Sequence, residues 1–123
     1  MIIFSDGGFG PKTGGYGSFK VENDDGTDYA LIRLVYDDFI CTNNRAEYQT
    51  LLEALQYCQH KGFKDIHIFI DSQLVARQLS HKYKIRNKQL AVFAEKIWLI
   101  IDTIDNIEIQ HVPRKVLVEK VGH

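Results

Sequence analysis

Apolar residues fall into five short runs that predict β-strands, and three of these runs come early in the chain. They are residues 2–4, 16–21 and 29–36. The last two flank NDDGTD, whose Asp25-Gly26 step is typical of a hairpin turn. The segment GGFGPKTGGYG separates the first two runs and predicts a loop and turn, because glycine and proline interrupt regular structure. We therefore expect an antiparallel meander in the first third of the chain.

The pattern changes to helical spacing at Asn44, where we expect a helix to begin. The positions that recur at this spacing are Asn44, Glu47, Tyr48, Leu51, Leu55 and Cys58, and Gly62 ends the helix after Lys61. Residues 65–70 are apolar or β-branched at nearly every position, as expected for a central strand that is covered on both faces.

The rest of the chain predicts two more helices and one more strand. Asp71-Ser72 caps a short helix that ends at Leu79, apolar positions from 90 to 104 mark a longer helix, and residues 108–112 form a last strand. A strand, a helix and a strand in succession predict a right-handed crossover. The expected fold is a single α/β domain over residues 1–123, with three antiparallel strands followed by strands joined through helices.

Composition narrows the class of protein. A chain of 123 residues with 45% hydrophobic and 25% charged residues suits one compact domain, and its net charge of -1 gives no overall field for a polyanion. No signal-like segment and no run of eighteen apolar residues is found, which predicts a cytoplasmic protein without a membrane partner. Cys41 and Cys58 lie about 20 Å apart along the expected helix, so both are expected to be free thiols. Without Cys or His at ligand spacing, zinc is not expected.

Three acidic residues are candidates for chemistry, and each has a structural explanation when taken by itself. Asp6 can start a turn, Glu47 can form a capping box with Asn44, and Asp71 can cap the helix that follows it. Taken together they favour a site. Asp6 and Asp71 both follow strands that the crossover makes parallel neighbours, about 4.8 Å apart, and Glu47 begins the crossover helix.

Three carboxylates that converge repel one another and raise one another's pKa, so a bound divalent cation is the natural explanation. Ligands that are all oxygen favour Mg²⁺ or Mn²⁺, and two such ions can activate a water and stabilise the departing oxygen of a phosphodiester. No organic cofactor is expected, and the sequence leaves the oligomeric state unknown.

The segments SDGG…GGYG, TNNRAEY, DSQLVARQL and HVPR occur in an order and spacing that resemble type 1 ribonuclease H over nearly the whole chain. The resemblance implies a five-stranded mixed sheet flanked by helices, and cleavage of the RNA strand of RNA/DNA hybrids with two Mg²⁺ ions. It also implies that Asp6, Glu47 and Asp71 are three of the family's four metal-binding carboxylates.

The same resemblance implies substrate contacts. Asn43, Asn44 and Gln73 are expected to contact the minor groove of the hybrid, where 2′-hydroxyls distinguish RNA from DNA. His111 stands where many family members carry a histidine that helps to move protons or release product, although a histidine at a strand end is often only structural. Arg114 is a further candidate for a phosphate contact.

The basic segment over residues 82–88 has two open interpretations. Lys84 and Arg86, with Lys82 and Lys88 beside them, can hold phosphates of the DNA strand, or the segment can be a solvated connection between helices. The longer basic protrusion of some family members is absent.

The resemblance ends near the C-terminus. Leu117 and Val121 stand where the family has an Asn and the fourth carboxylate, and residues 116–118 predict an extended tail in place of the family's last helix. Glu119 is the nearby acid that can substitute. Three interpretations remain open: an enzyme with three carboxylates, a truncated product, or a degenerate domain that binds hybrids without cutting them.

The favoured function is hydrolysis of the RNA strand of RNA/DNA hybrids, and the alternative from another class is a hybrid-binding or assembly module. A proofreading-type exonuclease would need an acid two positions after Asp6, where this chain has Gly8. An integrase-like transferase would need a different order of carboxylates. Neither pattern matches.

Overall fold

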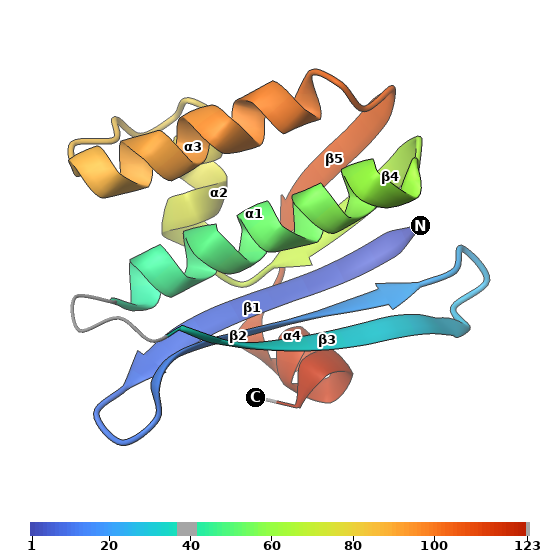
Figure 1. The fold of residues 1–123 in the computed structure, drawn as a ribbon, viewed down its shortest axis with the longest axis horizontal. Coiled ribbons are helices and arrows are strands. Elements are labelled where there is room, and N and C mark those ends of the chain that lie inside the picture. Colours follow the sequence, from blue (N-terminus) through green and yellow to red (C-terminus); the bar gives the residue numbers. More distant parts are fainter. Residues whose placement is uncertain (37–41, 123) are drawn as a thin grey trace.

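Residues 1–36 and 42–122 are described in the computed structural model of this chain, and they build a five-stranded sheet with helices on both faces (Figure 1). The strands are β1 (Ile2–Gly10), β2 (Gly14–Glu22), β3 (Asp28–Tyr36), β4 (Asp65–Ile70) and β5 (Asn106–His111). Their order across the sheet is β3-β2-β1-β4-β5. β1, β2 and β3 pair antiparallel, whereas β4 is parallel to both β1 and β5. The predicted α/β class and mixed sheet are confirmed.

The glycine-rich segment after Asp6 was expected to be a loop, and this prediction is wrong. β1 and β2 continue through the glycines, pair from Ile2↔Glu22 to Gly10↔Gly14, and leave only a short turn between them. The physical reason is close packing against the first helix. A Cβ at Gly7 would collide with the backbone of Ala46, and a Cβ at Gly17 would collide with the hydroxyl of Thr50.

The helices are α1 (Asn43–Lys61), α2 (Gln73–Leu79), α3 (Lys88–Ile101) and α4 (Arg114–Val121). α1 begins before the expected position, because Thr42 and not Asn44 is its N-cap. The Thr42 hydroxyl accepts a hydrogen bond of 3.2 Å from the backbone N–H of Arg45. Similarly, Ser72 and not Asp71 caps α2, since its hydroxyl accepts from the N–H of Val75. The side chains of Glu47 and Asp71 are therefore not used as caps.

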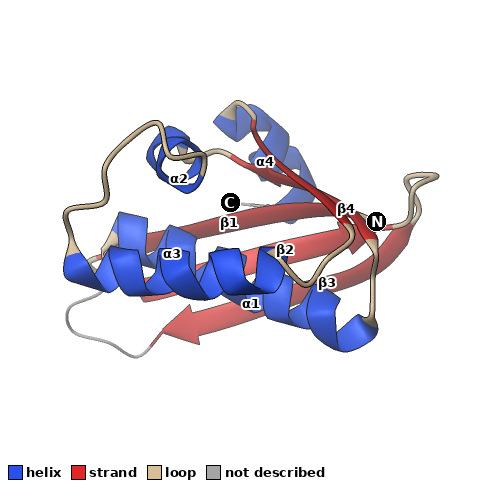
Figure 2. Cartoon of the chain, turned by 90° about the horizontal axis from the view of Figure 1, so that it is seen from above, coloured by secondary structure: helices blue, strands red, loops and turns tan. Residues whose placement is uncertain are grey.

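One large core lies between the sheet and α1, α2 and α3. It includes Ile3 and Ile68 from the strands, Leu51 and Leu55 from α1 and Ile97 from α3, all with no measurable exposure. Burying a side chain of this size contributes about 1.5–3 kcal/mol. Seen from above, α4 lies across the sheet from α1 and α3 (Figure 2).

The C-terminal segment was expected to be an extended tail, and this prediction is also wrong. Residues 114–121 form α4, which ends at Gly122 with a φ of 83°. Leu117 and Val121 are buried against Phe4 on the second face of the sheet. The β-branched residues of this segment favour strands, but packing on Phe4 outweighs that weak local preference.

Along the described ranges, no helix combines the length and the apolar character that a membrane crossing requires. Cys58 is buried in α1 as a free thiol, and burial raises its pKa to about 12. The interpretation made for Cys41 concerns a residue outside the described ranges.

Candidate active site

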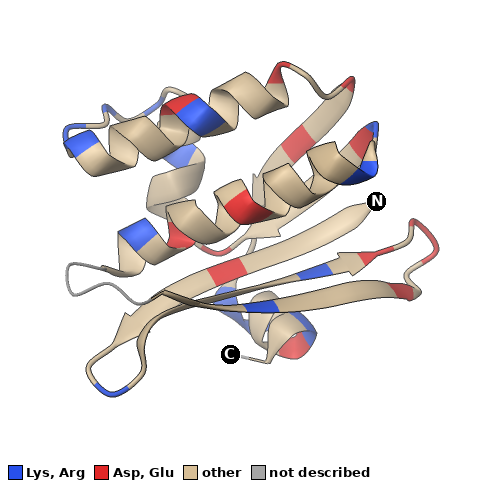
Figure 3. Ribbon diagram, viewed as in Figure 1, with Lys and Arg blue, Asp and Glu red and all other residues tan. Residues whose placement is uncertain are grey.

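Three acidic side chains from distant parts of the chain meet at the end of the sheet where β4 finishes. One carboxylate oxygen from each of Asp6, Glu47 and Asp71 lies within 4.8 Å of the other two. Figure 3 shows acidic segments of β1, α1 and the connection after β4 approaching one another. The predicted convergence of the three carboxylates is therefore present in the structure.

The position of Asp6 differs from the expectation in one respect. Asp6 was expected to end a strand, but it lies in the middle of β1, because β1 continues as a hairpin with β2. The parallel pairing of β1 with β4 stops one residue earlier, at Ser5↔Ile70. Asp6 and Asp71 are thus the first residues beyond the end of this pairing, which brings them to the same rim.

Gly7 explains how a helical residue reaches this rim. The backbone of α1 at Ala46 lies directly over Gly7, with no room for a side chain between them. Glu47 follows Ala46, and Gly7 donates a backbone hydrogen bond to the Glu47 carboxylate. The glycine after Asp6 therefore allows the close approach that sets Glu47 beside Asp6.

The site carries excess negative charge. Burial, followed by the charges of Asp6 and Asp71, raises the pKa of Glu47 to about 10, while the hydrogen bond from Gly7 acts in the opposite direction. Asp6 is 1% exposed. Acids that are buried and close to other acids favour either a bound proton or a bound cation.

Arg114 is the one candidate phosphate-binding residue that contacts these acids directly. Its Nη1 lies 3.5 Å from Oδ2 of Asp71, and its side chain is 64% exposed. α4 begins at this residue, so the C-terminal helix that the sequence did not predict is what brings the guanidinium to the rim.

The expected minor-groove residues lie in exposed positions around the N-termini of α1 and α2. Asn43 accepts a 2.7 Å hydrogen bond from the backbone N–H of Phe9 through its side-chain oxygen, which fixes the start of α1 to the end of β1. Asn44 and Gln73 are exposed in the first turns of α1 and α2.

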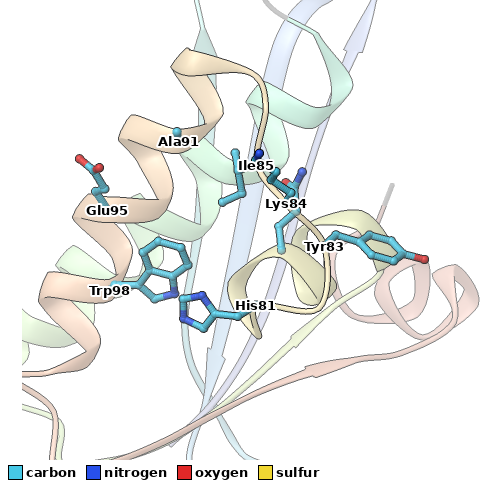
Figure 4. Close-up of a pocket in the computed structure, with 8 residues that line it drawn as sticks. His81, Tyr83, Lys84, Ile85, Ala91, Glu95 and Trp98 are labelled. Atoms are coloured by element: carbon cyan, nitrogen blue, oxygen red, sulfur yellow. The ribbon is translucent and has the colours of Figure 1, made fainter.

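The basic segment is separate from the carboxylates. Lys84 lines a cavity of about 380 Å³ between α2 and α3 that also holds His81 and Trp98. Figure 4 shows the ring of His81 beside the indole of Trp98, and their centroids are 4.5 Å apart. Arg86 is exposed in the same connection. The structure does not bring these two cations to the acids.

His111 ends β5 and is exposed. It lines a groove of about 360 Å³ together with Gln73, Arg77 and Lys82. Arg77 was not among the residues that the sequence pattern predicted for the site. The available signal was the spacing of Gln73, Arg77 and Ser80, which places them on one face of a helix.

The residues at the family's remaining positions do not complete the site. Leu117 and Val121 are buried against Phe4, and Glu119 is exposed on α4. Within residues 1–36 and 42–122, the acidic group that can hold a metal contains only Asp6, Glu47 and Asp71.

Comparisons with known proteins agree with this architecture. A family model described as reverse transcriptase-like matches residues 18–118. Ribonuclease HI of Halobacterium salinarum is 37% identical over 73 residues, which are 59% of this chain and 37% of that protein. The chain spans roughly a third of the length of the curated relatives it matches.

Two solved structures extend the likeness over almost the whole chain. RNase H1 from the halophilic archaeon Halobacterium salinarum NRC-1 superposes with a TM-score of 0.89 at 28% identity, covering 98% of this chain and 90% of that one. LC11-RNase H1 in complex with an RNA/DNA hybrid gives a TM-score of 0.85 at 26% identity, with coverages of 97% and 89%. Since the family model spans most of the sequence and the fold is shared throughout, the chain belongs to the reverse transcriptase-like family, and within it to the type 1 ribonuclease H-like proteins.

Proposed function

We propose that this protein hydrolyses the RNA strand of RNA/DNA hybrids at the rim formed by Asp6, Glu47 and Asp71. The observation that carries the proposal is that three carboxylates from separate elements lie within 4.8 Å of one another. A similar protein, LC11-RNase H1, has been solved with an RNA/DNA hybrid, which supports this class of substrate. The cytoplasmic location and the single-domain organisation expected from the sequence belong to the same proposal.

Mg²⁺ or Mn²⁺ fits the residues at this rim. The available ligands are carboxylate oxygens, which both ions prefer, and a cation offsets the burial and the repulsion that together raise the pKa of Glu47. Asp6, Glu47 and Asp71 would hold the ions. When bound, such ions lower the pKa of a water and offset charge on phosphate oxygens.

Other side chains of the chain would bind the substrate around that point. Arg114 presents a guanidinium beside Asp71, which suits a phosphate oxygen of the cleaved strand. Asn43, Asn44 and Gln73 present amides at the surface, which suits 2′-hydroxyls and base edges in a wide, shallow minor groove. Lys84 and Arg86 would hold phosphates of the DNA strand.

His111 would transfer a proton during cleavage. It is exposed at the end of β5, and its β4 partner in the sheet is Ile70, the residue before Asp71. An imidazole can both accept and donate a proton, and here it would donate one to the departing 3′ oxygen of the RNA.

A second function, binding of hybrids without cleavage, is favoured by one observation. Leu117 and Val121 are buried apolar residues where the family has an Asn and a fourth carboxylate. A site with three acids can bind a cation and a hybrid and still be slow in the chemical step.

A cleavage assay separates the two functions. An RNA/DNA hybrid with labelled RNA is incubated with the protein in Mg²⁺, in Mn²⁺ or in chelator, with DNA duplex and single-stranded RNA as substrate controls. The enzyme proposal requires cleavage of the hybrid RNA that depends on the metal and is abolished by Asp71→Asn. Binding by fluorescence anisotropy without any cleavage would instead support the binding module.

A further inference from the structure

A groove with charged and amide side chains along it lies between α2 and β5 and begins beside the carboxylates. One wall is the face of α2 that carries Gln73, Arg77 and Ser80, and Lys82 follows at the far end. The other wall is the C-terminal half of β5, including Gln110 and His111. Gln73 follows Asp71 by two residues, so the groove begins next to the proposed reaction centre.

β5 contributes backbone donors as well as side chains. It is an edge strand, and the N–H groups of Asn106 and Val112 donate to Lys64 and Ile70 on the β4 side. Because successive N–H groups alternate in direction along a strand, those of Ile109 and His111 point to the open side. Main-chain donors of this kind are common partners of nucleic-acid phosphates.

The groove is basic and one of its cations is held in place. Nη1 of Arg77 donates a 2.7 Å hydrogen bond to the hydroxyl of Tyr83, and its guanidinium lies 5.1 Å from the centre of the Tyr83 ring. Figure 4 shows that the Tyr83 ring points away from Trp98. Arg77 and Lys82 outnumber Glu108, the acid that also lines the groove.

We infer that this groove binds the backbone of the cleaved strand next to the scissile phosphate, with Arg77 and Lys82 holding its phosphates. The inference rests on the proposed function and adds a part of the substrate path to it. α2 has seven residues, so the groove extends roughly 10 Å, enough for the phosphates of about two or three stacked nucleotides.

The test compares two double variants that lose the same charge. Arg77→Ala with Lys82→Ala empties the groove of cations. Lys64→Ala with Lys96→Ala removes two exposed lysines from the start of β4 and from α3 and serves as the matched control. KM, kcat and the salt dependence of KM are measured on hybrids whose cleaved strand is shortened one nucleotide at a time from either end.

The wild-type KM should rise when nucleotides are removed from one end of the cleaved strand and not from the other. The groove variant should show a roughly tenfold higher KM on the longest hybrid, little further rise on shortening, and a salt slope that is smaller by about 2, with kcat nearly unchanged. Arg77→Lys with Lys82→Arg keeps both charges and should retain the wild-type salt slope.

One outcome would contradict the proposal for the groove, and another would contradict the proposed function. If the wild type cuts hybrids and the groove variant matches the control in KM and salt slope, the groove does not bind the strand, and the proposed function stands. If the wild type cuts no hybrid, the proposed function fails, and anisotropy with the same strands decides whether the groove binds them.

Discussion

Two groups of acidic residues lie on the same sheet and meet different surroundings. Glu22, at the end of β2, has a side chain that is 4% exposed and lies 3.3 Å from Nζ of Lys20 and 3.0 Å from Nζ of Lys120. Lys20 also contacts Asp28 at 3.0 Å. Two lysines and two acids balance, so the protein itself supplies the charge that burial of Glu22 requires.

The rim cluster is built differently. One carboxylate oxygen from each of Asp6, Glu47 and Asp71 lies within 4.8 Å of the other two, and Asp71 pairs at 3.5 Å with Arg114, whose side chain is 64% exposed. The first group fixes α4 to β2, because Lys120 belongs to α4. A buried acid that pairs with its own lysines has a structural role, whereas several acids that meet at one point favour a cation from solution.

Neutralising an acid at the rim should have the largest effect of all, and that effect should be a loss of hybrid cleavage. Asp6→Asn keeps the size of the side chain and removes one ligand charge, so hybrid cleavage should fall by about a thousandfold, equivalent to about 4 kcal/mol. In chelator the variant should unfold at a higher denaturant concentration than the wild type, because it relieves repulsion. A variant that cuts at the wild-type rate would show that the rim is not the reaction centre.

Neutralising Glu22 should lower the stability of the protein and leave its activity unchanged. Glu22→Gln leaves Lys20 and Lys120 facing a neutral amide, and we expect a loss of about 1–3 kcal/mol in the free energy of unfolding by urea. The lysines are partly exposed, which limits the cost. At temperatures where the variant is folded, its kcat on hybrids should match the wild type. A loss of activity without a loss of stability would contradict the structural role of Glu22.

The difference between the two groups could be predicted only in part from the sequence. The convergence of Asp6 with Asp71 was predictable, because strand, helix and strand make β1 and β4 parallel neighbours, although β1 continues past Asp6. The balance around Glu22 was not, since it depends on Lys120 in a helix that local preferences did not indicate. That helix forms because Leu117 and Val121 pack on Phe4, a contact across most of the chain.

The glycine-rich segment is a second case in which contacts between distant residues decide the structure. Glycine and proline correctly marked the turn after Gly10, but the strands on both sides of it depend on the contact of Gly7 with Ala46 and of Gly17 with Thr50. These close contacts join residues that are far apart in sequence. The conformational preference of each single residue therefore cannot predict them. The groove beside His111 is likewise made by elements that meet only in the fold.

Over a single pH unit, the dependence of stability on pH should distinguish the two groups by a smaller amount. The pKa of Glu47 is about 10 in the folded protein, against 4.5 in the unfolded chain, so between these values only the folded state holds the proton. In chelator, stability should therefore fall as pH rises through this window, by up to about 1.4 kcal/mol per pH unit. Urea unfolding of the wild type and of Glu47→Gln at several pH values measures this slope.

Glu47→Gln should lack this contribution, and Mg²⁺ should reduce the slope in the wild type, because a cation takes the place of the proton. Glu22→Gln should keep the slope, since its acid lies in the balanced group. An equal slope in Glu47→Gln and in the wild type would show that the surplus charge is not centred on Glu47.

The smallest effect is expected for Glu119, the acid that the sequence offered as a substitute for the fourth carboxylate. Glu119 is exposed on α4, whereas the buried side of that helix is formed by Leu117 and Val121, which face Phe4 and not the rim. Glu119→Gln should therefore change stability by less than about 0.5 kcal/mol. The Mg²⁺ concentration that half-saturates a rise in melting temperature should stay within about twofold of the wild type, a difference below about 0.4 kcal/mol. Glu47→Gln, measured beside it, should shift that concentration strongly. If both variants weakened Mg²⁺ binding alike, Glu119 would have to contact the cation. Because the structure places Glu119 outside the rim, α4 would then have to rearrange when the cation binds.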